Sequence, residues 1–169
     1  MQAVNTIRKI MDKVIMGAAI FCFMAMVLVG TYQIASRYFL GKPSTISEEL
    51  LTSLFTWMSL FASAYVFGKR DHMRMAFLAD KVKGTAKKVL DIVLELLVLG
   101  FAAMALVWGG FAIMNLTMSQ TTASLGVPMG VVYAILPISG CCIVAYSILN
   151  IIDMLHGKDL NVKQEVETE

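Results

Sequence analysis

Hydrophobic residues along the chain gather into four long runs that are separated by short polar segments. These runs cover residues 14–36, 50–68, 89–119 and 130–152. Three of them contain no charged residue, and the third carries only Asp91 and Glu95, both close to its start. A helix rises about 1.5 Å per residue, so about 20 apolar residues cross a bilayer core of about 30 Å. The pattern therefore predicts an all-α, polytopic membrane protein with four transmembrane helices.

The second helix is expected to begin a few residues before its apolar run. Thr45 and Glu48 have the spacing of a capping box, and Ser47 is an alternative cap. Glu48 and Glu49 then fall in the first turn, where carboxylates favour the positive end of the helix dipole. The predicted helices cover about residues 14–36, 47–68, 89–119 and 130–152. Residues 1–157 thus form one transmembrane domain, and residues 158–169 form a polar tail.

The distribution of basic residues predicts the topology. Lysine and arginine number three before the first run, two in the first loop, seven from the second loop into the third helix, none in the third loop and two in the tail. Cytoplasmic segments carry the excess of these residues in membrane proteins. Both termini and the second loop are therefore expected in the cytoplasm, which places twelve basic residues inside and two outside.

Composition supports the membrane interpretation and narrows the possible functions. Hydrophobic residues make up 58% and charged residues 15% of the chain, against about 45–50% and about 25% in soluble domains. A net charge of +2 is too small to indicate binding to nucleic acid. We expect no catalytic, substrate-binding or metal site and no cofactor, because His72 and His156 both lie outside the apolar runs.

The second loop is predicted to hold a short amphipathic helix. Between residues 72 and 83, Met73, Phe77 and Leu78 share one face, with basic residues on the others. Such a helix lies on the cytoplasmic surface against anionic phospholipid. A plain solvated loop is the alternative. Lys69, Arg70 and His72, at the start of this loop, are candidate contacts with lipid or a partner.

Four further residues are candidate contacts near or within the membrane. Glu95 shares a helix face with Lys87 and Asp91, and it either reaches toward the headgroups or contacts a partner subunit. Arg37 ends the first helix and is expected to bind phosphate or to pair with Glu48 or Glu49, while docking of an external protein is an alternative. Trp57 lies near mid-membrane, where an indole most often packs against another helix.

Three groups of residues resemble a known family. They are Ser36-Arg37-Tyr38-Phe39 with Ser47-Glu48-Glu49-Leu50 and Trp57, then Gly68-Lys69-Arg70-Asp71-His72-Met73, then Leu125-Gly126-Val127-Pro128 with Tyr133 and Leu136-Pro137-Ile138. In this order and spacing, the chain resembles the small membrane subunit (DctQ type) of the tripartite ATP-independent periplasmic (TRAP) transporters. The resemblance spans nearly the whole chain.

The resemblance implies a function that depends on partners. It implies a bacterial inner-membrane scaffold subunit that acts with a large membrane subunit and a periplasmic substrate-binding protein. Such systems import small organic acids, of the sialic acid or C4-dicarboxylate class, with a sodium gradient. An alternative function is the membrane anchor of a quinone- or haem-linked oxidoreductase, although haem ligation requires histidines within the bundle.

Overall fold

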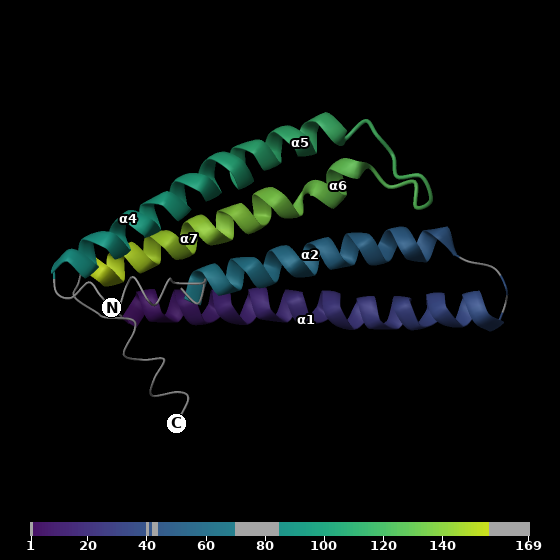
Figure 1. Cartoon of the computed structure of the whole chain (residues 1–169), viewed down its shortest axis with the longest axis horizontal. Helices are drawn as coiled ribbons and strands as arrows, with labels where there is room; N and C mark the ends of the chain where they lie inside the picture. The colour runs from purple at the N-terminus through teal and green to yellow at the C-terminus, as the bar shows by residue number, and fades with distance from the viewer. Residues whose placement is uncertain (1, 40, 42–43, 70–84, 156–169) are drawn as a thin grey trace, which may run out of the picture.

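The computed structural model describes residues 2–39, 41, 44–69 and 85–155, which are mostly helical (Figure 1). Its elements are α1 (Gln2–Phe39), α2 (Thr45–Lys69), α4 (Thr85–Phe101), the π-helix η1 (Ala102–Trp108), α5 (Gly109–Thr117), α6 (Met129–Tyr133) and α7 (Ile135–Leu155). The elements α4, η1 and α5 follow one another without a break. Four helical segments are long and apolar enough to cross a membrane. The predicted all-α fold with four membrane-length helices is therefore confirmed.

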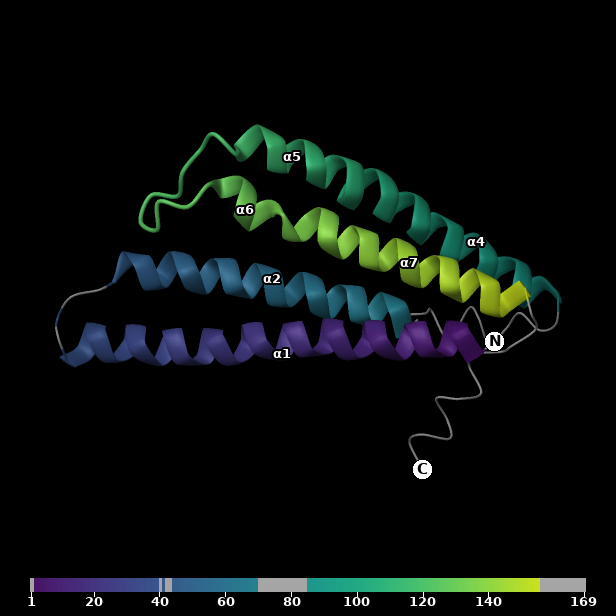
Figure 2. The ribbon, with the colours of Figure 1, turned by 180° about the vertical axis from the view of Figure 1, so that it is seen from behind.

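The helices form two antiparallel hairpins. One is α1 with α2, and the other is the continuous α4–η1–α5 helix with α6 and α7 (Figures 1 and 2). We call the end that holds the start of α1 and the end of α7 the terminal end, and the opposite end the loop end. Both views show the two hairpins close together at the terminal end and further apart toward the loop end.

Helix α7 lies at the centre of the bundle. In the most apolar part of the fourth span, which contains α7, 44% of the residues are buried. The corresponding shares in the first, second and third spans are 11%, 6% and 11%. It packs against α2, α4 and η1. The core cluster consists of Ala64, Ala102 and Ile143, which come from three different spans. The first and third spans expose most of their large apolar side chains, which a lipid environment or a partner helix accommodates.

Helix α1 begins twelve residues earlier than its apolar run predicts, at Gln2 rather than at residue 14. At about 1.5 Å per residue, its 38 residues span about 57 Å, well beyond the bilayer core. The added turns carry Arg8 and Asp12, which are spaced i, i+4 and both contact α7. This part of the helix is therefore polar and packs against α7 through side-chain contacts, rather than through an apolar surface.

The third and fourth spans are less regular than the sequence indicates. The π-helix η1 was not predicted, and Gly140 of α7 lies against it, because a Cβ at Gly140 would meet the Cβ of Leu106 at 2.7 Å. The fourth span is interrupted at Ala134. The expected cause is Pro137, which has no N–H to donate one turn back.

The start of α2 corrects the predicted cap. The Oγ of Ser44 accepts hydrogen bonds from the backbone N–H of Ser47, at 3.3 Å, and from the hydroxyl of Ser47, at 3.0 Å. Ser44 therefore caps the helix in place of Thr45 or Ser47. The predicted surface helix at residues 72–83 and the polar tail at residues 158–169 lie outside the described residues, so both stay predictions.

Candidate functional site

An ion pair joins the first and last helices at the terminal end. The Nη2 of Arg8 lies 2.8 Å from the Oδ2 of Asp153, although the two residues are 145 positions apart in the chain. The side chain of Arg8 is 19% exposed and that of Asp153 only 7%. Burial of a charged group is costly unless an opposite charge compensates for its lost hydration, which Arg8 does for Asp153. This pair therefore ties α1 to α7.

The buried side chain of Tyr146 connects three helices next to this ion pair. Its hydroxyl donates a hydrogen bond to the Oδ1 of Asp12 on α1, at 2.6 Å. Its ring lies against Gly68 near the end of α2, where an added Cβ would approach the ring carbons to 2.7 Å. Only glycine leaves room for the ring at this position, so Gly68 and Tyr146 set the spacing between the two hairpins.

A third polar contact joins α4 to α7. The Nδ2 of Asn150 donates a hydrogen bond to the Oε1 of Glu95, at 3.0 Å, and both residues are buried. Tyr146, Asn150 and Asp153 follow at i, i+4 and i+7, so they share one face of α7. We call this set of interacting side chains the polar seam; it comprises Arg8, Asp12, Glu95, Tyr146, Asn150 and Asp153.

The polar seam is suited to holding helices together. Within it, Arg8 faces a carboxylate, Asp12 accepts from a phenol and Glu95 accepts from an amide. Among the described residues, no group of three or more histidine, cysteine, aspartate or glutamate side chains could hold a metal ion. Polar contacts of this kind are a main source of specific helix association in lipid.

At the loop end, Glu49 binds the connection between α5 and α6. Its Oε2 accepts hydrogen bonds from the backbone N–H groups of Ser124 and Leu125, at 2.8 and 3.0 Å. Gly126 adopts φ +66°, which favours glycine, and an isolated antiparallel bridge pairs Thr121 with Pro128. A tight turn is thus present here, and a side chain from the other hairpin holds it.

We expect Glu49→Gln to loosen this turn. A charged acceptor makes stronger hydrogen bonds than an amide oxygen, by about 1 kcal/mol each, so exchange of the amide hydrogens of Ser124 and Leu125 should become about fivefold faster at each residue. Hydrogen–deuterium exchange of the purified protein measures this. Glu48→Gln is the matched control, because Glu48 precedes Glu49 and is exposed. Equal exchange rates in wild type and Glu49→Gln would show that the carboxylate does not hold the turn.

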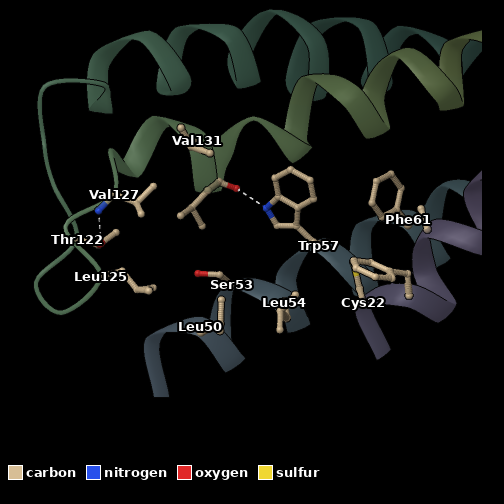
Figure 3. A pocket seen from close by; sticks show the side chains of 13 residues that line it. Cys22, Leu50, Ser53, Leu54, Trp57, Phe61, Thr122, Leu125, Val127 and Val131 are labelled. Carbon is tan, nitrogen blue, oxygen red and sulfur yellow. Dashed lines mark hydrogen bonds between the residues drawn. The ribbon is translucent and has the colours of Figure 1, made fainter. Parts of the chain in front are cut away.

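An apolar pocket of about 480 Å³ lies next to this turn, between α1, α2 and α6 (Figure 3). Cys22 lines it from α1, Trp57 from α2 and Val131 from α6. The Nε1 of Trp57 donates a hydrogen bond to the carbonyl of Val132, at 3.1 Å, which joins α2 to α6. No lining residue is charged, so the pocket offers no cationic partner for the carboxylate of an organic acid.

Comparison with known proteins places this architecture in a family. The family model described as "Tripartite ATP-independent periplasmic transporters, DctQ component" matches residues 26–157, which include all four spans in whole or in part. The chain belongs to the DctQ family. This DctQ protein is therefore a transporter component and not an enzyme. It is also similar to the sialic acid TRAP transporter small permease protein SiaQ of Vibrio cholerae, with 28% identity over 137 residues that cover 76% of this chain and 79% of SiaQ.

The structure of this DctQ protein brings three of the predicted contact residues into tertiary contacts. Glu49 binds the turn, Trp57 binds α6 and Glu95 binds α7. Arg37 and Glu48 are exposed near the loop end, and no ion pair joins them within the described residues. Lys69 is exposed, and its Nζ lies 4.9 Å from the centre of the Tyr65 ring. Arg70 and His72 lie outside the described residues.

Sequence reasoning missed most of the polar seam. Arg8 was used only in the count of basic residues that predicts the topology. No role was predicted for Asp12, Tyr146, Asn150 or Asp153. One signal was present, because Tyr146, Asn150 and Asp153 place three polar groups on a single helix face. Polar groups along one face of a membrane helix indicate contact with another helix rather than with lipid. Of the partners, Glu95 on α4 stands out as a carboxylate within a span, whereas Arg8 and Asp12 on α1 lie before the apolar run and carry no comparable signal.

Proposed function

We propose that this chain is the scaffold subunit of a sodium-coupled TRAP transporter that imports a small organic acid. The main support for the proposal is that the chain belongs to the DctQ family and contains the polar seam. Its ionisable groups at Arg8, Asp12, Glu95 and Asp153 all make hydrogen bonds within the chain. Those of Arg8, Asp12 and Asp153 join the two hairpins, and that of Glu95 joins α4 to α7 within the second hairpin. A subunit whose buried charges serve its own packing is suited to support, while a partner binds the ion and the substrate.

The proposed partners are a large membrane subunit, a periplasmic substrate-binding protein and the surrounding phospholipid. The exposed apolar faces of α1 and of the continuous α4–η1–α5 helix are available to a membrane partner or to lipid. The excess of basic residues before α1 and between the second and third spans supports an inner-membrane orientation with both termini in the cytoplasm. In that orientation the turn held by Glu49 faces the periplasm.

The proposed substrate class is sialic acid, with C4-dicarboxylates as the second candidate. Similarity to the sialic acid TRAP transporter subunit SiaQ of Vibrio cholerae supports the first class. The apolar pocket of this chain does not select between them, because none of its lining residues is charged. The substrate site is therefore expected in the large subunit, and this chain is expected to influence its position rather than its chemistry.

Reconstitution tests the proposal. We expect the tagged chain to co-purify in detergent with a large membrane subunit, and we expect uptake of labelled sialic acid into proteoliposomes to need both subunits, the binding protein and a sodium gradient. Unlabelled sialic acid should compete with uptake, and succinate should not. Transport by this chain alone would contradict the proposed scaffold role, as would an equal rate of transport without it.

A further inference from the structure

An open groove lies at the terminal end and shares Asp12 with the polar seam. Its volume is about 470 Å³, and it lies between the first half of α1 and Tyr65 near the end of α2. Lys9, Asp12 and Lys13 line one part of it, and Met16, Gly17 and Ile20 line the rest. All six come from α1, so the groove runs along that helix from a part with net basic charge, called the basic part, to an apolar part.

The basic part of the groove is poorly neutralised. Lys9 and Lys13 are one helical turn apart and exposed, and neither makes an ion pair within the described part of the chain. The neighbouring carboxylate, Asp12, already accepts a hydrogen bond from Tyr146. The ring of Tyr65, which lines the groove from α2, also lies 4.9 Å from the ammonium group of Lys69. The groove itself thus carries two lysines and one aspartate, so its formal charge is positive.

The apolar part extends toward the middle of the span. From Lys9 to Ile20 the helix rises about 16 Å, which is about half of the hydrocarbon thickness of a bilayer. A Cβ added at Gly17 would meet nothing within 4 Å, so open space lies directly over the helix there. The side chains of Met16 and Ile20 flank this space and are 45% and 55% exposed. The groove thus has the depth of one lipid leaflet.

We propose that this groove binds an anionic phospholipid, with its phosphate between Lys9 and Lys13 and one acyl chain over Gly17. The order of the lining residues matches the order of groups in a lipid, with charge at headgroup level and apolar surface below it. Basic residues near the membrane surface attract anionic lipid by electrostatic interaction. Because the aliphatic stem of a lysine is long, its ammonium group reaches the phosphate while the stem stays in apolar surroundings. The inference does not depend on which substrate the transporter carries.

Native mass spectrometry of the full chain, purified with the membrane subunit that accompanies it, tests the proposal. We expect the protein to retain phosphatidylglycerol and to release phosphatidylcholine of the same acyl composition under equal conditions. Lys13→Gln should weaken retention of phosphatidylglycerol about fivefold. Arg37→Gln is the comparison variant: it removes an exposed cation at the other end of α1, outside the groove, and should weaken retention less than Lys13→Gln does.

A pair of glycine variants separates lipid binding from a general effect of charge. Gly17→Leu keeps every charge but fills the groove, so it should abolish retention, whereas Gly100→Leu should not, although its Cβ also meets nothing within 4 Å. Equal retention of both lipids, or equal effects of the two glycine variants, would overturn the proposal. Displacement of phosphatidylglycerol by inorganic phosphate would indicate a site for phosphate rather than for lipid, and would overturn the proposal. If Gly17→Leu released the membrane subunit while the amount of retained lipid stayed the same, the groove would be a protein contact. That result would also overturn the proposal.

Discussion

Arg8→Gln is expected to lower the free energy of unfolding by about 3 kcal/mol, at the low end of the range for breaking a buried ion pair because Arg8 is partly exposed. The loss arises because Asp153, which is 7% exposed, then remains as a carboxylate without its cation. Equilibrium unfolding in mixed micelles of sodium dodecyl sulfate and a non-ionic detergent measures the change. Asp153→Asn should also destabilise the protein, because it leaves the guanidinium of Arg8 without its counter-charge.

The double variant Arg8→Gln with Asp153→Asn distinguishes this explanation from a general loss of packing. With neither charge present, no unpaired ion is buried, so the double variant should be more stable than Arg8→Gln alone. Additive losses in the double variant would show that the two side chains contribute independently, and would contradict a direct ionic contact between α1 and α7.

Gly68→Ala is expected to lower the free energy of unfolding by about 2 kcal/mol. The added Cβ would approach the Cγ and both Cδ atoms of Tyr146 to 2.7–2.8 Å, and these atoms are close to the backbone of α7 and cannot move far. The ring must shift or the two hairpins must separate, and a shift would also disturb the hydrogen bond from Tyr146 to Asp12. The same unfolding measurement in mixed micelles reports the loss.

Gly100→Ala is the matched control for Gly68→Ala. Both glycines lie in membrane-length helices, but a Cβ at Gly100 meets nothing within 4 Å. Because alanine favours a helix over glycine by about 1 kcal/mol, Gly100→Ala should leave stability unchanged or raise it. A loss of the same size in both variants would show that contact with Tyr146 is not the reason for destabilisation.

The sequence indicated some of the contact residues but not the residues that they bind. Glu49 and Glu95 stand out in the sequence because carboxylates are rare in and next to membrane spans. Their partners, the turn at Ser124 and the amide of Asn150, lie 75 and 55 residues away. Local patterns carry no information about such pairings. The predicted pairing of Arg37 with Glu48 or Glu49 was not found in the described residues, because Glu49 binds backbone N–H groups instead.

The polar start of α1 shows a second limit of local patterns. Hydrophobicity predicts a helix only where the chain enters the bilayer, so the turns that carry Arg8 and Asp12 were left outside it. The π-helix of the third span likewise has no signal in the hydrophobic pattern, and it lies where α7 presents Gly140. Both features accompany contacts with α7, which is distant from α1 in the chain.

The sequence by itself determined that this is an all-α membrane protein with four spans, because the length and apolarity of a span are properties of consecutive residues. Its motifs also indicated the DctQ family, which comparison confirmed. The tertiary structure alone decided that α7 is central, that Tyr146 packs on Gly68 and that Arg8 pairs with Asp153. The physical reason is that apolar side chains are equally suited to face lipid or another helix, so hydrophobicity does not indicate which helices pack together. Small residues and polar pairs that lie far apart in the chain determine the helix contacts instead.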